Sequence, residues 1–84
     1  MIDAQKNVLI VDADSDQRQA LVDLLATDGY AVMAASDGEE ALLKLEGGQI
    51  DLVVADENMR SMSCRELLWE CVRRWQGLPF VMLS

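Results

Sequence analysis

Four short runs of apolar residues are spaced along the chain and separated by polar stretches, at residues 8–11, 31–35, 52–55 and 80–83. The runs at 8–11 and 52–55 are continuous, which is typical of strands buried on both faces of a parallel sheet. The run at 31–35 is weaker and more like an edge strand. The pattern therefore predicts four β-strands.

Two of the intervening stretches predict helices with clear ends. In residues 15–28 the leucines recur at helical spacing, and Gly29 follows where a C-terminal cap belongs. Asp37 and Glu40 form an acidic analogue of a capping box, and the helix that they begin ends at the glycine pair of residues 47–48.

The third intervening stretch begins with a capping box, in which Ser63 is followed three residues later by Glu66. Six side chains after it share one face of the predicted helix, which makes a complete amphipathic stripe. They are Cys64, Leu67, Leu68, Cys71, Val72 and Trp75. Gly77 and Pro79 end the helix.

Strands and helices thus alternate along the chain, and this order predicts a parallel α/β sheet with right-handed crossovers. Neither a linker nor a low-complexity tract divides the chain, so we expect residues 1–84 to form a single domain. The two cysteines, Cys64 and Cys71, lie about 10.5 Å apart along a helix axis, which is too far for a disulfide. Because the chain has no histidine, a zinc site is not expected, and both thiols are predicted to be buried.

The net charge of −8 argues against nucleic acid or an anionic membrane surface as a partner of this chain. No apolar run approaches the roughly 18 residues that a membrane-spanning helix needs. The first residues lack the basic and apolar regions of a signal peptide. We therefore expect a cytoplasmic location.

Acidic residues follow two of the buried strands directly. Asp12 and Asp14 come after the first strand, Asp56 follows the third, and Ser84 follows the fourth. If these strands are neighbours, the side chains converge at one edge of the sheet, where α/β proteins bind ligands. Clustered carboxylates without histidine or thiolate suit a hard cation such as Mg²⁺.

The alternative is that these acids only cap a helix. For Asp14 and Ser15 this is the favoured interpretation, because such residues are among the most frequent N-caps. It is weaker for Asp12 and Asp56, because each directly adjoins a buried strand, where an unpaired charge is costly.

Four segments together resemble the receiver domain of two-component response regulators, over Val8 to Ser84: LIVDADSDQR, DGYAV, ASDGEEAL and DLVVADENM. The resemblance implies a flavodoxin-like sheet in the order 2-1-3-4-5 with helices on both faces. It also implies transfer of a phosphoryl group from a histidine kinase or phosphotransfer protein to an aspartate, with Mg²⁺. For this chain we expect the first four strands, in the order 2-1-3-4, and three helices.

The resemblance assigns roles to individual residues. Asp56 takes the place of the phospho-acceptor and also of a metal ligand, and Asp12 takes the first position of the acidic pair that binds Mg²⁺. Asn58 stands where a backbone carbonyl binds the metal, and Ser84 stands where a hydroxyl contacts the phosphoryl group and drives switching.

The chain also departs from the family pattern. Ala13 occupies the second position of the acidic pair, so a metal ligand is missing and Mg²⁺ binding is expected to be weakened. Asp14 is an additional candidate ligand, although consecutive side chains point in different directions. The family's fifth strand, the lysine that follows it, and its fourth and fifth helices have no counterpart among the 84 residues.

With the order 2-1-3-4, one helix must cover one sheet face while two helices cover the other, so about half of one face is expected to lack cover. The strand at 80–83 would then be an open edge. Either a partner chain covers these surfaces, most simply in a homodimer, or the sequence is a fragment of something longer.

Three hypotheses follow. The first is a phosphorylatable receiver, a signalling module rather than an enzyme. The second is a degenerate pseudo-receiver that acts as a protein-interaction or dimerisation module, which Ala13 and the missing lysine favour. The third is a small α/β enzyme or nucleotide binder. Against the third, neither G-x-G-x-x-G nor G-x-x-x-x-G-K-[ST] follows any predicted strand.

Overall fold

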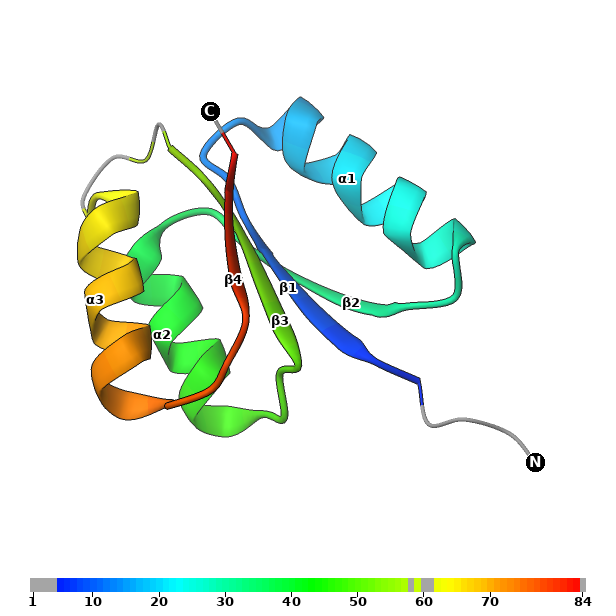
Figure 1. Cartoon of the computed structure of the whole chain (residues 1–84). Helices are drawn as coiled ribbons and strands as arrows, with labels where there is room; N and C mark the ends of the chain where they lie inside the picture. The colour runs from blue at the N-terminus through cyan, green and yellow to red at the C-terminus, as the bar shows by residue number, and fades with distance from the viewer. Residues whose placement is uncertain (1–4, 58, 60–61, 84) are drawn as a thin grey trace.

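The structure is a computed structural model that describes residues 5–57, 59 and 62–83. Strands and helices alternate along the described chain (Figure 1). In chain order they are β1 Asn7–Val11, α1 Ser15–Thr27, β2 Ala31–Ala35, α2 Gly38–Gly47, β3 Leu52–Asp56, α3 Cys64–Arg74 and β4 Phe80–Leu83.

The strands form one parallel sheet in the order β2-β1-β3-β4. The predicted α/β class, strand order and helix count are therefore confirmed for the described part of the chain. The boundaries differ slightly, because α1 ends at Thr27 and β3 includes Asp56. Asp56 is thus the last residue of a strand rather than the first residue after it.

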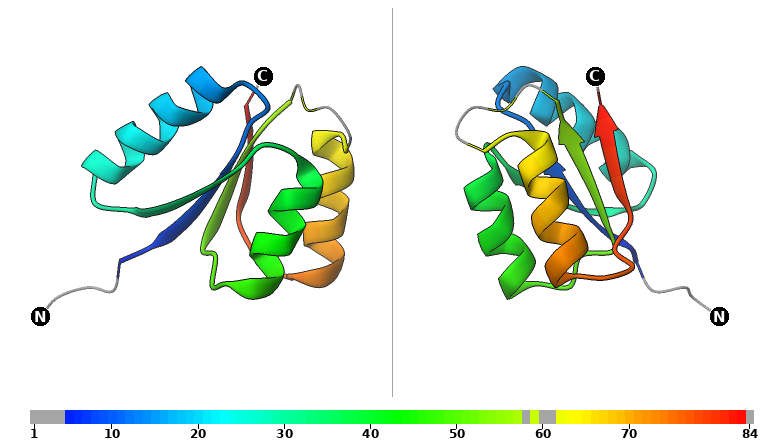
Figure 2. Two further views of the ribbon diagram at one scale, coloured as in Figure 1. Left: turned by 180° about the vertical axis from the view of Figure 1, so that it is seen from behind. Right: turned by 60° about the vertical axis from the view of Figure 1, so that its left-hand side comes forward.

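The helices cover the two faces of the sheet unequally. Helix α1 lies on one face, and α2 and α3 lie side by side on the other (Figures 1 and 2). An ion pair between Arg74 of α3 and Glu46 of α2 joins the two neighbours. This placement is what right-handed crossovers require for the observed strand order.

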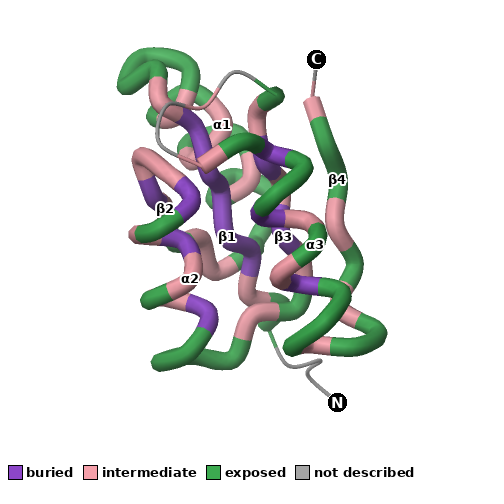
Figure 3. The backbone as a smooth tube through the Cα atoms, turned by 90° about the vertical axis from the view of Figure 1, so that its left-hand side faces the viewer, coloured by how far each residue is buried: buried purple, intermediate pink, exposed green. Residues whose placement is uncertain are grey.

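The main core lies between the sheet and the α2–α3 layer. Its buried members are Leu9, Val11, Ala35, Ala41, Leu45, Val53, Ala55, Cys64, Leu67 and Cys71. Both cysteines are free and buried, as predicted. Strand β1 is buried from Val8 to Val11, as its continuous apolar run predicted (Figure 3).

The opposite face is less completely filled. Side chains alternate along a strand, so Val8 and Ile10 of β1 point toward α1, away from the core that contains Leu9 and Val11. Helix α1 packs mainly on β1 and β2 and buries none of its residues completely. Its Leu24 is 61% exposed, and on β4 Val81 is 44% exposed. The structure agrees with the expectation that part of this face lacks cover.

Each helix begins at a polar cap that the sequence indicated. Asp37 caps α2, and its Oδ1 accepts a hydrogen bond from Glu40 N at 2.8 Å. Ser63 and Glu66 form the predicted capping box of α3. Gly29 ends the turn after α1 with φ of +97°, a conformation that favours glycine. No helix in the described residues is both long and apolar enough to span a bilayer.

Candidate functional site

The carboxyl ends of β1 and β3 lie next to each other in the sheet. Val11 of β1 is the register partner of Ala55 of β3. The next residues, Asp12 and Asp56, therefore lie side by side at the carboxyl ends of these two strands. Asp56 is half-buried, and its negative charge acts on the Asp12 carboxyl group. The structure therefore brings together the two carboxylates that the sequence singled out.

Asp12 is completely buried. Its Oδ1 accepts a hydrogen bond from Asp14 N at 2.9 Å, whereas its Oδ2 has no hydrogen-bond partner among the described residues. Burial raises the pKa of Asp12, and the charges of Asp56 and Asp14 raise it further against the lowering effects of the Asp14 N–H and Arg18. A buried carboxylate oxygen without a partner is costly, and a bound cation would offset that cost.

The backbone of Asp12 is fixed on both sides. Its N–H donates to Ala35 O of β2 at 3.0 Å, and its carbonyl accepts a hydrogen bond from Arg18 Nη1 at 2.7 Å. The sequence reasoning missed Arg18. Its signal was a basic residue in the first turn of a helix, where the helix dipole disfavours positive charge unless a partner compensates.

Asp14 serves as the N-cap of α1. Its Oδ1 accepts hydrogen bonds from Asp16 N at 2.9 Å and Gln17 N at 3.2 Å. Within the described residues, no group of three or more His, Cys, Asp or Glu side chains is arranged to hold a metal ion. Metal binding by Asp14 therefore stays a prediction beside its observed capping role.

Two predicted site residues, Asn58 and Ser84, lie outside the described residues. Their proposed contacts with the metal and the phosphoryl group stay predictions. Among the described residues, Leu83 is the register partner of Asp56, and its carbonyl accepts a hydrogen bond from Glu57 N at 2.8 Å.

The thiols do not belong to this site chemically. Burial raises the pKa of Cys64, and it raises the pKa of Cys71 to about 11. Burial therefore disfavours the thiolate form, which is the form that acts as a nucleophile or a soft metal ligand. The chemistry that the described site residues offer is that of carboxylate oxygens.

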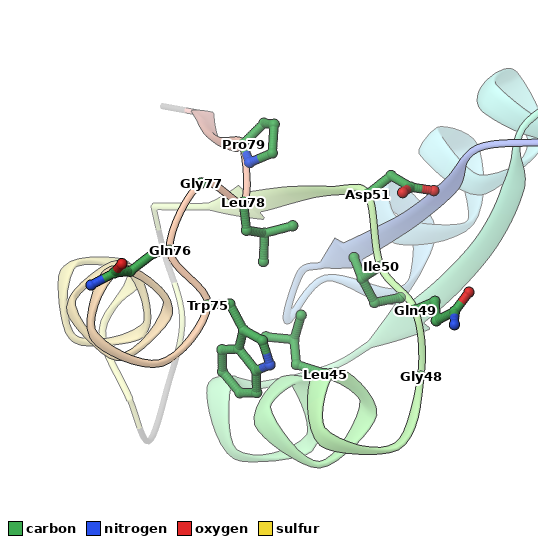
Figure 4. Close-up of a pocket in the computed structure, with 10 residues that line it drawn as sticks. All are labelled: Leu45, Gly48, Gln49, Ile50, Asp51, Trp75, Gln76, Gly77, Leu78 and Pro79. Atoms are coloured by element: carbon green, nitrogen blue, oxygen red, sulfur yellow. The ribbon is translucent and has the colours of Figure 1, made fainter.

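A pocket of about 500 Å³ lies at the amino ends of β3 and β4, where the loops after α2 and α3 lead into these strands (Figure 4). Leu45, Trp75 and Leu78 lie around its apolar side. It lies at the opposite end of the strands from Asp12 and Asp56. The acidic edge, where charge is concentrated at strand ends, is the better candidate for a reactive site.

Comparison with known proteins gives one consistent result. A family model described as the response regulator receiver domain matches residues 8–84. The chain is 32% identical to the transcriptional regulatory protein GlrR of Escherichia coli (strain K12) and 33% identical to response regulator RR06 of Streptococcus pneumoniae, over 78 residues each. Each match covers 93% of this chain but 18% and 36% of those relatives, respectively.

Solved structures show the same likeness in three dimensions. The chemotaxis response regulator CheY4 of Vibrio cholerae matches with a TM-score of 0.91 and 31% identity, over 94% of this chain and 68% of that one. The response regulator TrrA of Thermotoga maritima, in complex with Mg²⁺ and BeF, matches with a TM-score of 0.90 and 32% identity, over 93% and 68%.

Proposed function

This chain belongs to the response regulator receiver domain family, and on that premise we propose that it accepts a phosphoryl group on the Asp56 carboxylate with the help of Mg²⁺. One observation carries the proposal: the buried, unpartnered Oδ2 of Asp12 belongs to the carboxylate beside Asp56. The phosphoryl donor would be a histidine kinase or a phosphotransfer protein. The chain would act as a signalling module rather than as an enzyme.

In the proposed transfer, a carboxylate oxygen of Asp56 attacks the phosphorus of a phosphohistidine. The new O–P bond gives an acyl phosphate, while the N–P bond breaks and its electron pair returns to the imidazole. Mg²⁺, when bound, would neutralise charge on the transferred group. Asp12 would hold the cation through Oδ2, together with Asp56 and the backbone carbonyl of Asn58. Ser84 would contact the phosphoryl group.

The hydrogen bonds around Asp12 support this role. Because its backbone is held by Ala35 and Arg18, the carboxyl group keeps a fixed direction before any cation arrives. Such preorganisation lowers the cost of binding and of charge development in transfer. Ala13 supplies no oxygen at the adjacent position, so we propose that the cation binds weakly.

Incubation with acetyl phosphate, with and without Mg²⁺, tests the proposal. We expect intact-protein mass spectrometry to show one added phosphoryl group that depends on Mg²⁺. Labelling that is equally fast in EDTA would contradict the role of the metal.

A second candidate function is an interaction module that works without phosphorylation, and Ala13 is the observation that favours it. In that case no label would appear at any Mg²⁺ concentration. The net charge of −8 supports a protein partner rather than nucleic acid, and a cytoplasmic location fits both candidates.

We also propose that the chain forms a homodimer through β4. In the described residues this strand pairs on one side only, with β3. It carries no charge, and Val81 and Met82 are 44% and 39% exposed. Natural edge strands are usually protected by charge, proline or a covering element, so an open apolar edge favours pairing with a second copy.

A further inference from the structure

The sheet has two edges, and β2 forms the edge opposite β4. In the described residues β2 pairs only with β1 (Figure 3). Ala31 N donates a hydrogen bond to Lys6 O at 2.9 Å, and Ala35 O accepts one from Asp12 N at 3.0 Å. Since the backbone groups of successive residues in a parallel strand face opposite neighbours, those of Ala34 point away from β1, toward the open edge.

Lys44 of α2 reaches across to this edge. Its Nζ donates a hydrogen bond to Ala34 O and lies 3.5 Å from Glu40 Oε2, one turn earlier in the same helix. Glu40 in turn accepts hydrogen bonds from Ser36 N at 2.8 Å and Ser36 Oγ at 2.9 Å, directly after β2. The bonds from Ser36, and more weakly Lys44, lower the pKa of Glu40 against the raising effect of burial. The ammonium group is therefore held at the edge by a carbonyl and a carboxylate.

This ammonium group makes β2 a poor site for a further strand. A strand that adds to β2 needs Ala34 O as the acceptor for one of its own N–H groups, and Lys44 already donates to that oxygen. The added strand would also cover the Lys44 side chain, which is 33% exposed, and removing a charge from water is costly. Charged side chains, and lysine above all, commonly protect edge strands in this way.

The β4 edge is different. Leu83 O accepts a hydrogen bond from Glu57 N next to β3, so the backbone groups of Phe80 and Met82 point away from β3. The four residues of β4 include no charged side chain. Because all strands of the sheet are parallel, β4 of one copy would match β2 of another copy in direction and could extend its sheet.

We propose that Lys44 blocks the β2 edge against a second copy of this chain, and so restricts assembly to a dimer in which β4 pairs with β4. The inference rests on the proposed homodimer. A contact between two β4 strands uses the same surface of both copies and is complete at two. A contact between β4 and β2 leaves one free edge at each end of the assembly, so it continues to grow. Lys44 thus determines which of the two contacts can form.

The test compares Lys44→Met with two controls. Lys44→Met removes the ammonium group and keeps a long side chain of good helix propensity. Lys6→Met makes the same substitution at an exposed lysine before β1, and Lys44→Arg keeps the charge and the donors at the edge. Both methionine variants change the net charge by −1 from −8, so added repulsion opposes association equally in the two.

Light scattering over a dilution series gives the mass of each assembly. Wild type, Lys6→Met and Lys44→Arg should reach a plateau at twice the chain mass of 9.3 kDa. Lys44→Met should continue to grow with concentration, to at least about 2-fold above the dimer mass. A Lys44→Met protein that stops at the dimer would overturn the proposal, as would equal growth of Lys6→Met.

A double variant separates pairing of edges from aggregation of unfolded chains. With Val81→Lys added to Lys44→Met, β4 carries a charge and the contact between β4 and β2 is blocked. Growth should then stop at two copies or fewer, and unchanged growth would overturn the proposal. Circular dichroism checks that each variant is folded, and Lys44→Gln replaces Lys44→Met in every comparison if the methionine variant does not fold.

Hydrogen exchange locates the new contact. The N–H groups of Val32 and Ala34 both point to the open edge of β2, where a strand of another copy would protect them. We expect these two groups to exchange about 10-fold more slowly in the Lys44→Met assembly than in wild type. Unchanged rates would overturn the proposal.

A monomeric wild type is a separate outcome. If wild type stays monomeric at high concentration, the proposed β4 dimer fails, and Lys44 is judged by its own variant. Lys44→Met exposes Ala34 O and should associate through β2, whereas Lys6→Met should remain monomeric. A Lys44→Met protein that also stays monomeric would overturn the role of Lys44.

Discussion

The two faces of the sheet differ in how completely they are filled. Under α2 and α3, side chains from β1, β2, β3 and both helices form one buried cluster, and Phe80 of β4 packs against it. Under α1, the helix buries none of its own residues completely, and Val81 on β4 stays exposed. Asp56 alternates with Val53 and Ala55 of the filled side, so its side chain belongs to the open side. The larger buried cluster lies on one face, and Asp56, the proposed phospho-acceptor, lies on the other.

The difference between the two faces follows from the free energies of burying apolar and charged groups. A filled face gains about 25 cal/mol for each Å² of apolar surface removed from water. A reactive carboxylate needs access to a cation and a phosphoryl donor, which a closed core would deny. Because Asp56 lies on the less filled side, it is only half-buried, while the core on the opposite face holds the sheet together.

The largest expected effect comes from removing a side chain on the filled face. Leu67→Ala leaves a cavity in the core and should lower the free energy of unfolding by about 2–5 kcal/mol. Leu24→Ala on α1 should cost less than about 1 kcal/mol, because that side chain is mostly exposed. Urea unfolding followed by circular dichroism measures both. Equal losses would show that the faces do not differ as described.

The next largest effect is expected for a substitution on the edge strand β4. Val81→Lys places a charge on β4 and should weaken homodimerisation by about 2 kcal/mol, or roughly 30-fold in the dissociation constant. Leu43→Lys is the control, because Leu43 is 69% exposed on α2, away from β4. Light scattering across a dilution series gives the dissociation constants. A wild-type protein that is monomeric at high concentration would refute assembly through β4.

The cost of the buried acid can be isolated with Asp12→Asn in EDTA. The pKa of Asp12 is raised in the folded protein, so the protonated form is favoured by folding. The contribution of Asp12 to the free energy of unfolding is therefore complete below its unfolded pKa near 3.8. This contribution is lost as the pH rises through the pKa of Asp12 in the folded protein. At neutral pH the variant should therefore be more stable than wild type by about 1 kcal/mol. Melting curves from pH 3 upward, at roughly unit steps, follow the difference. A variant that is less stable at neutral pH would mean that Asp12 is compensated without a cation.

An effect of comparable size concerns the missing oxygen at position 13. Ala13→Asp adds a charged ligand beside Asp12, so Mg²⁺ should bind about 10-fold more tightly, or by about 1.4 kcal/mol. Ala13→Asn controls for size without adding a charge. Calorimetric titration of the three proteins compares their affinities. Equal affinity for wild type and Ala13→Asp would mean that another group already fills the ligand position.

Most of the fold could be predicted from the sequence because its signals are local. Continuous apolar runs predicted the strands, and capping residues such as Ser63 predicted where helices begin. The family resemblance predicted the order of the strands in the sheet. Contacts between distant segments could not be predicted in this way. Gly38 and Met62 are 24 positions apart, and nothing in their spacing indicates that they touch.

The positions of some candidate site residues could also be predicted, whereas their proposed roles stay predictions. Asp12 and Asp56 were identified because each adjoins a buried strand, where a carboxylate needs a reason to be present. Asp14 fits two roles in the sequence, and only its hydrogen bonds to the first turn of α1 reveal the cap. Arg18 was missed although a basic residue in the first turn of a helix needs a partner, because that partner is a backbone carbonyl that the sequence does not identify.

Site-specific labelling tests the central claim most directly. Wild type, Asp56→Asn and the control Asp28→Asn are each treated with acetyl phosphate and Mg²⁺, and the phosphorylated residue is mapped by tandem mass spectrometry. Asp28 is an exposed acid after α1, remote from the site. The account predicts a single label on Asp56 in wild type and Asp28→Asn, and none in Asp56→Asn. Undiminished labelling of Asp56→Asn would contradict it.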